Sequence, residues 1–378
     1  MTTLNIPSSP SQGATYEANG VVYTWDGTKW KADSSYVSNL NGGPLAGFRN
    51  ALINGGMEVF QRETGAPVVV SATSGQYVLD RWKIRSNVIG ADTTITVQDI
   101  TTSNHPAGIW KAIRMKNANV SVAPVSNQYV GIQQPLEQST TRALGFGSPL
   151  NQSLSIGFYI RSSVGGTYTF SVQSSGAPRK SYLFDFDVPA DTTNWTYVSH
   201  TFPSNSDISF LTQEGGAIIS LYLSSGSSFV GGANETWNDG ELFLTSNAIN
   251  NFTNTANATV DLTAVQLEPG PVATPFEQRP IGTELALCQR YYYKAPDGIW
   301  RLYQSGSSRV QANMWFPVTM RTTPTCALYN VSASGSVTSV DATDPTPAGF
   351  LALCQPNNAT LPGTTEAAAG TYSGDAEL

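Results

Sequence analysis

Short runs in which apolar and polar residues alternate, separated by turn-forming residues, fill the chain from residue 47 to about residue 270. In residues 154–158 (LSIGF) every second residue is apolar, which is the period of a strand with one buried face. No helical period interrupts these runs, which cover residues 82–84, 94–97, 109–115, 154–160, 168–172, 181–188, 195–202, 217–223, 241–245 and 259–267. Strands at this spacing predict a jelly-roll β-sandwich, in which two antiparallel sheets each bury one face.

A smaller β unit is expected before the sandwich. Residues 16–31 (YEANGVVYTWDGTKWK) contain Asn19-Gly20 and Asp26-Gly27, and each pair can adopt the positive φ values of a tight hairpin turn. The pattern predicts a three-stranded meander that carries four large aromatic side chains: Tyr16, Tyr23, Trp25 and Trp30. Because a unit of this size has little core of its own, we expect it to need a partner surface or a symmetry mate. Residues 39–44 (NLNGGP) then indicate a hinge.

One helix is expected, directly after a proline-rich extended strap at residues 268–282. Residues 284–294 (ELALCQRYYYK) place Leu285, Cys288 and Tyr292 at three- and four-residue steps, which gives one apolar stripe. A helix this short is marginal alone, so the stripe must pack on something. Two partners fit: the adjacent sandwich, or two further copies of the chain that meet on a symmetry axis.

Residues 295–378 return to a strand pattern at residues 299–303, 310–318, 327–331 and 350–354. The final residues are rich in Gly, Ala and Thr, and we expect them to form a flexible tail. The chain is therefore predicted to be all-β, in four parts. These are an N-terminal meander with its hinge (1–45), a jelly-roll sandwich (46–280), a short helix (281–294) and a C-terminal β domain (295–378).

The composition agrees with an all-β chain and excludes several classes of function. Charged residues make up 12% of the chain, about half of the roughly 25% found in average soluble proteins. The formal net charge is −7 and no segment collects Lys or Arg, which argues against nucleic-acid binding. No run approaches the about 18 apolar residues of a membrane span, so we expect no membrane insertion.

The start of the chain and its cysteines indicate folding in a reducing cytoplasm. Residues 1–5 (MTTLN) lack the basic and apolar regions of a signal peptide. Cys288, Cys326 and Cys354 are too few and too scattered for a disulfide framework or a zinc site. We expect no metal and no cofactor.

Candidate catalytic residues are sparse, and we expect the chain not to be an enzyme. Its two histidines, His105 and His200, belong to none of the common hydrolase, metalloprotease or nucleotide-binding motifs. Asp185 and Asp187 share one side of a predicted strand and indicate a solvated face. Residues 235–241 (ETWNDGE) combine three carboxylates, an amide and a tryptophan. A plain hairpin turn, a sugar site and a calcium site made of oxygen ligands all fit this segment.

Sugar binding requires an aromatic face for the apolar side of a pyranose and a few polar groups for its hydroxyls. Five residues in expected edges and loops combine these features: Trp237, Asp239, Trp300, Tyr303 and Trp315. The other tryptophans are expected in cores, as strand aromatics usually are; they are Trp25, Trp30, Trp82, Trp110 and Trp195. The low charge and the many Ser, Thr and Asn residues suit a surface that recognises neutral hydroxyls.

Several motifs resemble parts of phage structural proteins. Residues 23–30 (YTWDGTKW) resemble short modules in structural proteins of phages that infect cyanobacteria. Residues 50–62 (NALINGGMEVFQR), followed by 79–82 (LDRW), look like the opening of a widespread phage tail-fibre sandwich, with Leu79 where that family usually has Ala. Two later segments are similar to the closing strand and strap of the same family: residues 265–279 (VQLEPGPVATPFEQR) and 284–292 (ELALCQRYY).

This resemblance implies a virion protein of the tail-fibre or receptor-binding class, with a carbohydrate-binding-like sandwich and no catalysis. Such fibres are usually homotrimers, which makes Leu285, Cys288 and Tyr292 candidate contacts between copies. Residues 1–45 would attach to phage tail or adaptor proteins, 46–280 would form the stem, and 295–378 would form a tip that binds a host-surface glycan. Assembly in the host cytoplasm and release by lysis account for an extracellular role without secretion. Three weak sites on one stem would bind by avidity.

Two alternatives to a tail fibre stay open. A polysaccharide depolymerase needs two carboxylates roughly 5–9 Å apart in a groove, although the chain lacks the regular repeats of a β-helix. A head or tail adaptor, or a decoration protein, would have no ligand. Its aromatic side chains would be buried, whereas a glycan-binding tip would expose some of them.

Overall fold

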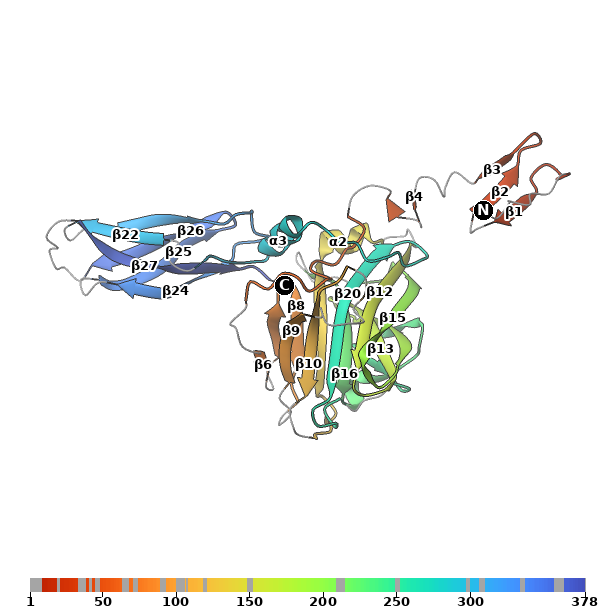
Figure 1. The fold of residues 1–378 in the computed structure, drawn as a ribbon, viewed down its shortest axis with the longest axis horizontal. Helices are drawn as coiled ribbons and strands as arrows, with labels where there is room; N and C mark the ends of the chain where they lie inside the picture. Colours follow the sequence, from red (N-terminus) through yellow and green to blue (C-terminus); the bar gives the residue numbers. More distant parts are fainter. Residues whose placement is uncertain are drawn as a thin grey trace.

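The computed structural model describes residues 9–18, 21–32, 39–40, 43–44, 48–62, 68–70, 74–88, 93–99, 106, 108–117, 121–147, 152–208, 215–248, 252–296, 300–305, 310–333, 337–356 and 364–377. These residues are organised mainly in antiparallel sheets, so the all-β prediction is confirmed. A large sandwich forms the centre, and an elongated C-terminal β domain projects from it (Figure 1).

The N-terminal sheet is the predicted three-stranded meander. It consists of β1 (Thr15–Ala18), β2 (Val21–Trp25) and β3 (Trp30–Ala32), each antiparallel to the next. Trp25 lies opposite Trp30 with the ring centroids 5.6 Å apart, and the Asp26 carboxylate closes the turn by accepting the Thr28 and Lys29 N–H groups. In the expected hinge, β4 (Asn39–Leu40) and β5 (Gly43–Pro44) form a small hairpin.

The sandwich consists of two antiparallel sheets. The six-stranded sheet has the order β15 (Asp191–Pro203), β12 (Ser153–Ser162), β20 (Thr259–Pro269), β10 (Lys111–Asn117), β9 (Thr93–Asp99) and β6 (Val68–Val70). The seven-stranded sheet has the order β18 (Thr236–Asp239), β14 (Lys180–Val188), β13 (Gly166–Ser174), β16 (Gly215–Ser225), β11 (Tyr129–Glu137), β8 (Trp82–Ser86) and β7 (Ser74–Leu79). Most of these strands fall on the predicted runs.

Alternation along each strand decides which face of its sheet is buried. In β12, Ile156, Phe158 and Ile160 belong to the core between the sheets, and the residues between them face the other way. Phe158 stacks on Phe170 of β13 with the ring centroids 5.1 Å apart, which joins the two sheets. Burying one such side chain contributes roughly 1.5–3 kcal/mol, so this core stabilises the sandwich.

Strand β11 lies in the middle of its sheet but was not predicted. It contains Gly131, a residue type that weakens strands, and Pro135, a residue type that is rare in central strands. Gly131 is needed because a Cβ there would lie 2.6 Å from the Tyr222 ring. Pro135 lies opposite Ile218 next to an irregularity in the register, and the short helix α2 (Gln138–Ala143) begins directly after the strand.

A loop covers the outer face of the seven-stranded sheet. It contains the 3-10 turn η1 (Ser227–Phe229) and the short parallel strands β17 (Val230–Gly232) and β19 (Leu244–Thr245). Phe243 stacks on Tyr222 of β16 with the ring centroids 3.8 Å apart. The strand predicted at residues 241–245 is therefore formed only at its last two residues, because Phe243 belongs to this cover.

The C-terminal domain also has two packed sheets. One contains β21 (Tyr292–Lys294), β22 (Trp300–Ser305), β24 (Thr325–Ala333) and β27 (Thr364–Asp375). The other has the order β23 (Val310–Trp315), β26 (Gly349–Pro356) and β25 (Val337–Thr346). Met314, Phe316, Phe350 and Tyr372 form the centre of its core.

The prediction of a flexible tail at the end of the chain is wrong for the residues that the structure describes there. Residues 364–375 form β27, which pairs with β21, β22 and β24. Small residues suit this position because Gly374 lies against the Phe316 ring, where a Cβ would be 2.7 Å from the ring. This segment is thus the strand on which the other three strands of its sheet pair.

The predicted helix forms as α3 (Ile281–Gln289), but both of its predicted ends are wrong. It begins three residues earlier than residue 284, where the Thr283 and Glu284 N–H groups donate to the Pro280 carbonyl. Tyr292 lies on β21 instead of the helix. Cys288 and Tyr292 are buried within one chain and Leu285 is half-buried, so the stripe packs mainly on its own chain. Contact between copies at these residues stays a prediction.

Candidate functional site

The segments that carry the phage resemblance meet at one end of the sandwich. The Asn50 amide donates to the Val265 carbonyl at 3.0 Å, which ties the opening segment to β20. The Asn54 amide donates to the Asp80 carbonyl at 3.0 Å, and the Trp82 indole N–H donates to the Asn54 carbonyl at 2.9 Å. The two motifs at residues 50–62 and 79–82 therefore form one hydrogen-bonded unit.

The strap is held to the same unit by Arg279. Its guanidinium donates to the backbone carbonyls of Asn50 and Leu52 and to the Glu284 carboxylate. Glu277 on the strap accepts the Asn50 N–H at 3.0 Å. These contacts explain the spacing of the motifs, because each polar side chain satisfies backbone groups of a distant segment.

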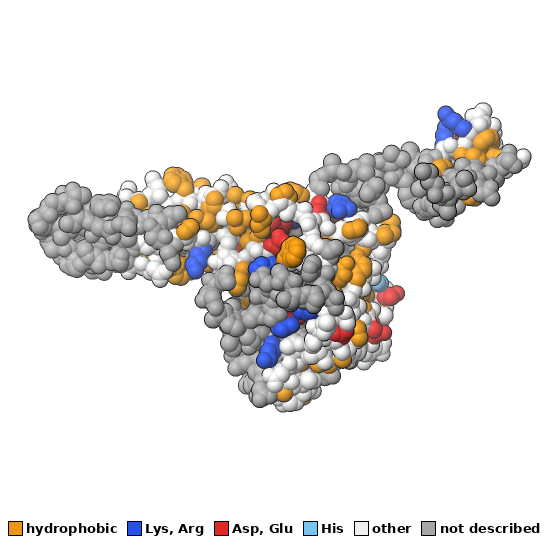
Figure 2. Space-filling view, in the orientation of Figure 1, with side chains coloured by type: hydrophobic (Ala, Val, Ile, Leu, Met, Phe, Trp, Pro, Cys, Tyr) orange, Lys and Arg blue, Asp and Glu red, His pale blue; other side chains and the backbone are white. Residues whose placement is uncertain are grey.

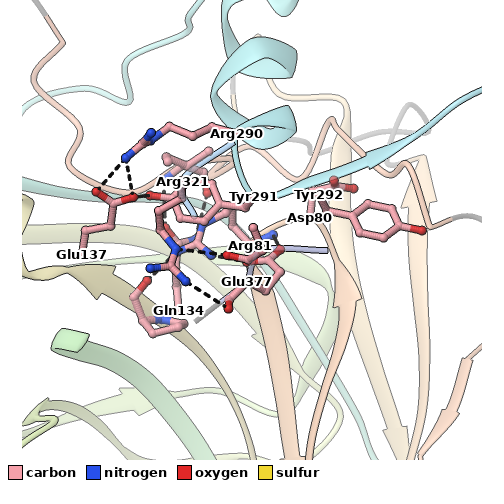
Figure 3. Close-up of polar contacts among 12 residues, drawn as sticks. Asp80, Arg81, Gln134, Glu137, Arg290, Tyr291, Tyr292, Arg321 and Glu377 are labelled. Atoms are coloured by element: carbon pink, nitrogen blue, oxygen red, sulfur yellow. Dashed lines mark hydrogen bonds and ion pairs between the residues drawn. The ribbon is translucent and has the colours of Figure 1, made fainter. Parts of the chain in front are cut away.

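This end of the sandwich also carries the C-terminal domain, through one buried ion pair and one that is partly exposed. Figure 3 shows Arg81 of the LDRW motif pointing at Glu377, and Arg290 reaching Glu137. The Arg81 and Glu377 side chains are only 1% and 4% exposed. The Arg81 guanidinium also lies 3.6 Å from the centre of the Tyr291 ring. Tyr291 in turn donates to Glu137 at 2.8 Å.

A second pair of motif residues completes the junction. The Gln61 side chain donates to the Asp80 carboxylate and to the Tyr292 carbonyl, each at 2.7 Å. The Arg62 guanidinium lies 3.6 Å from the centre of the Tyr292 ring. Burial raises the pKa of Asp80 from 3.8 to about 6. We conclude that the motif residues fix the C-terminal domain to the sandwich, because Gln61 and Arg81 bind Tyr292 and Glu377 of that domain.

The predicted ligand residues Trp237 and Asp239 lie on β18, at the edge of the sandwich. The Trp237 indole N–H donates to the Pro203 carbonyl at 3.1 Å, and its ring packs on Tyr182 and Phe146. Asp239 is 91% exposed at its side chain and pairs with Lys180 at 2.9 Å. Trp237 thus closes the open edge between the sheets, and its contacts are accounted for without a ligand.

The other predicted ligand residues lie in the C-terminal domain. Trp300 and Tyr303 belong to β22, and their side chains lie outside the described part of the chain. Trp315 lies at the end of β23 in the other sheet and is 64% exposed. The structure therefore does not bring the five predicted residues into one site, and Trp315 is the one with a described, exposed ring.

Alternation in β23 explains why Trp315 faces solvent. Ala312 and Met314 pack in the domain core, so Asn313 and Trp315 face outward, and both are exposed. The backbone at Trp315 is nevertheless fixed, because its carbonyl accepts the hydroxyl of the buried Tyr372 at 2.7 Å. A rigid strand thus presents a large exposed ring, and Figure 2 shows few charged side chains on the visible part of this domain.

A hollow of about 150 Å³ lies beside the Trp315 ring. Its polar lining consists of Asn313, Asp344 and Thr346, which supply an amide, a carboxylate and a hydroxyl, although the hydroxyl is already bonded to the Gly349 backbone. Asp344 has a φ of +50° and lies where the pairing of β25 with β26 becomes irregular. Such an irregularity re-aims side chains at the end of a strand. We call this surface of Asn313, Trp315, Asp344 and Thr346 the Trp315 face.

Gly349 gives the Trp315 face its shape. It lies directly opposite Trp315 in the sheet, and it has no side chain to fill the hollow. A Cβ at this position would lie 2.2 Å from the Met314 carbonyl oxygen, so larger residues cannot replace it without a backbone shift. The hollow is smaller than the roughly 300–1,000 Å³ of common small-molecule pockets, which suits one ring of a longer ligand.

Carboxylates gather at a different cavity, beside the strap. Glu58, Glu277 and Glu284 line about 20 Å³ of space, which is room for roughly one water molecule. Glu277 and Glu284 pair with Arg279. Burial and the nearby Glu284 raise the pKa of Glu58. This cavity is too small for a sugar ring.

The remaining candidates for catalysis are engaged in structural contacts. Asp185 and Asp187 each accept a hydrogen bond at 2.7 Å from a threonine of the neighbouring strand. His200 stacks on Phe184 with the ring centroids 4.3 Å apart, and burial lowers its pKa. His105 lies outside the described residues.

The described residues contain no group of three or more His, Cys, Asp or Glu side chains in a metal-binding arrangement. Neither helix described has both the length and the apolar character that a bilayer crossing needs. The three cysteines are free.

Sequence reasoning missed the residues that surround Trp315. The alternation in residues 311–315 (QANMW) could have placed Asn313 on the same face as Trp315. Asp344 gave no such signal, because its position depends on the irregular pairing of two strands distant in sequence. The expectation that Trp110 is a core residue is wrong, since it is 49% exposed, whereas Trp82 is buried as predicted.

Comparisons with protein-family models and with curated proteins give no match. Among solved structures, the chain is similar to the enzymatically active domain of tailspike protein 4 of bacteriophage CBA120, with 10% identity and a TM-score of 0.29. That match covers 58% of this chain and 21% of the tailspike chain, so this chain spans about a fifth of the tailspike's length.

Carbohydrate-binding modules also resemble the chain. The family 11 module of the cellulase Lic26A-Cel5E of Clostridium thermocellum has 11% identity and a TM-score of 0.27, covering 56% of this chain and 98% of the module. The xylan-binding domain of Xyn10C from Paenibacillus barcinonensis has 11% identity and a TM-score of 0.26, covering 55% and 95%. Scores this low carry no argument about function, and the sandwich stands on the strand pairing described above.

Proposed function

We propose that the chain is a non-catalytic attachment protein of a phage virion, of the tail-fibre class, that binds a host-surface glycan through the Trp315 face. The observation that carries the proposal is the exposed indole of Trp315 beside the Asn313 amide and the Asp344 carboxylate. Such a ring can stack on the apolar side of a pyranose while the polar groups bind its hydroxyls.

The virion part of the proposal is supported by the motifs. Residues 50–62, 79–82, 265–279 and 284–292 resemble a phage tail-fibre sandwich, and they assemble one hydrogen-bonded junction. A fixed junction suits a fibre, because the binding domain is then held at a defined place on its stem. In this account residues 1–45 attach to the phage tail or an adaptor, and three copies bind the cell surface together.

The absence of catalysis is inferred from the lining of the hollow. Glycoside hydrolysis normally uses two carboxyl groups on either side of the scissile bond. Among the described residues that line the hollow beside Trp315, only Asp344 carries a carboxylate. A depolymerase would therefore need a site elsewhere in the chain.

A glycan array tests the proposal. The full-length protein is expected to bind one class of saccharide, and Trp315→Ala is expected to lose that binding. Tyr329→Ala is the matched control, because Tyr329 is a 43% exposed aromatic residue on the other sheet of the same domain. Absence of binding by the unaltered protein would favour an adaptor role, and equal binding by Trp315→Ala would overturn the site.

A further inference from the structure

A second group of aromatic side chains lies on the outer face of the six-stranded sheet. Tyr159 of β12 is directly opposite Tyr197 of β15, and their ring centroids are 4.9 Å apart. Trp195 lies two residues before Tyr197 and therefore on the same face. Outward positions of an antiparallel sheet are normally polar, so three adjacent aromatic residues at such positions require a reason.

Of the three rings, Tyr197 is the open one, whereas Tyr159 and Trp195 are half-buried against a small apolar cluster. Tyr197 is 46% exposed. Gly157 makes room for it, because a Cβ there would lie only 2.7 Å from the Tyr197 hydroxyl oxygen. The same glycine is bordered by Ala273 of the strap, so the Tyr197 ring lies across the sheet between β12 and the strap.

Two arginines share one carboxylate next to these rings. Asp261 of β20 is paired with Arg114 of β10 and Arg161 of β12, with Nε–O distances of 2.6 Å in both cases. The three residues come from adjacent strands. The Arg161 guanidinium also lies 4.5 Å from the centre of the Trp195 ring, which connects the charged group to the aromatic group.

The charged groups that meet solvent on this face are mainly cationic. Asp261 is almost completely buried, and the Arg114 side chain is 26% exposed, so the guanidinium is the group that meets solvent. Lys116 lies two residues further along β10 and is exposed. The carboxylates on this face are already engaged: Asp191 accepts hydrogen bonds from its own turn, and the buried Glu268 accepts from Gln266 and Thr274. The formal charges therefore nearly balance, but the groups that meet solvent on this face are mainly cationic.

We infer that this face, formed by Tyr159, Trp195, Tyr197, Arg114 and Arg161, binds an acidic saccharide, independently of the Trp315 face. Aromatic rings offer a stacking surface for a sugar ring. A guanidinium donates to carboxylate or sulfate groups with a geometry that a lysine cannot reproduce. The solvent-facing cations Arg114 and Lys116 favour an anionic saccharide over the neutral one expected at Trp315.

The test titrates the full-length protein with two tetrasaccharides, tetragalacturonic acid and its methyl ester, by isothermal titration calorimetry. A sulfated chondroitin tetrasaccharide separates carboxylate from sulfate recognition. We expect at least one acidic probe to bind with a dissociation constant of roughly 1 mM, and the neutral ester to bind at least tenfold more weakly.

Variants assign the binding to this face. Tyr197→Ala and Arg114→Gln are each expected to weaken binding of the acidic probe about tenfold or more, whereas Tyr197→Phe retains it because the ring remains. Arg114→Gln leaves Asp261 paired with Arg161, so the fold is kept, which thermal unfolding verifies. Trp315→Ala is expected to bind the acidic probe normally, which separates this site from the proposed glycan site.

Four results would overturn the inference. One is no binding of either acidic probe, and another is equal binding of the ester. The third is binding that survives both Tyr197→Ala and Arg114→Gln. A change of oligomeric mass in Tyr197→Ala without a change in saccharide binding would also overturn it, because the face would then be a contact between copies.

Discussion

At the scale of single residues, Trp82 and Trp315 show two opposite uses of one side chain. Trp82 is 2% exposed, packs in the sandwich core and donates its indole N–H to Asn54. Trp315 is 64% exposed and contributes little apolar burial. The first stabilises the fold, and the second is available for a ligand.

This contrast predicts different effects on stability. Trp82→Ala is expected to lower the free energy of unfolding by about 3–5 kcal/mol, because it empties a packed core position. Trp315→Ala is expected to change it by less than about 0.5 kcal/mol, as surface substitutions usually do. Urea denaturation of both variants measures this. A strongly destabilised Trp315→Ala would mean that its ring is structural.

Asp80 predicts a pH dependence. Its pKa is raised from 3.8 to about 6 by burial, so the folded chain holds a proton on Asp80 more tightly than the unfolded chain does. The free energy of unfolding contributed by this group therefore falls as pH rises from 3.8 to about 6 and is constant above that range. The span corresponds to on the order of 3 kcal/mol.

Asp80→Asn should remove this dependence. The difference in unfolding free energy between the unaltered protein and the variant, measured at intervals from pH 3.8 to 7, is expected to shift in favour of the variant as pH rises. Other titrating groups are common to both proteins and cancel. Parallel pH profiles would contradict the raised pKa.

The residues of the candidate site could be predicted only in part. Trp315 was identified because a tryptophan lay beside polar residues in a strand pattern. The same reasoning selected Trp237, but the sequence does not show that its ring closes the edge of the sandwich against Tyr182. Exposure depends on neighbours from distant segments, which a linear pattern does not contain.

At the scale of elements, the junction between the sandwich and the C-terminal domain depends on the last strand and its end. Arg81 and Glu377 are both buried there. Glu377→Gln leaves the Arg81 charge without its partner, and we expect a loss of about 3–5 kcal/mol in unfolding free energy. Asp375→Asn is the control, because the exposed Asp375 carboxylate contributes less than about 1 kcal/mol. Equal effects in denaturation would contradict a buried junction.

Elements were predictable where alternation was regular, as in β12 and β14. They were missed where special residues serve tertiary contacts. Gly131 and Pro135 concealed the central strand β11, and the small residues of β27 resembled a flexible tail. In both cases packing against a neighbour, such as Tyr222 or Phe316, overrides the local preference.

At the scale of the whole molecule, attachment by avidity requires several copies to act together. Light scattering of the purified chain is expected to give a mass near three times 40.3 kDa. Deleting residues 1–45 should leave a soluble, folded trimer that no longer joins virions. A monomer would remove the avidity argument, and loss of folding after the deletion would contradict a separate N-terminal unit.

The most direct test of the attachment function is a competition assay with the parent phage. Purified full-length protein is added to host cells, and the fraction of phage that adsorbs is measured. We predict that the unaltered protein and Tyr329→Ala lower adsorption in a concentration-dependent way, while Trp315→Ala does not. Adsorption that is unaffected by the unaltered protein, or lowered equally by Trp315→Ala, would contradict attachment through the Trp315 face.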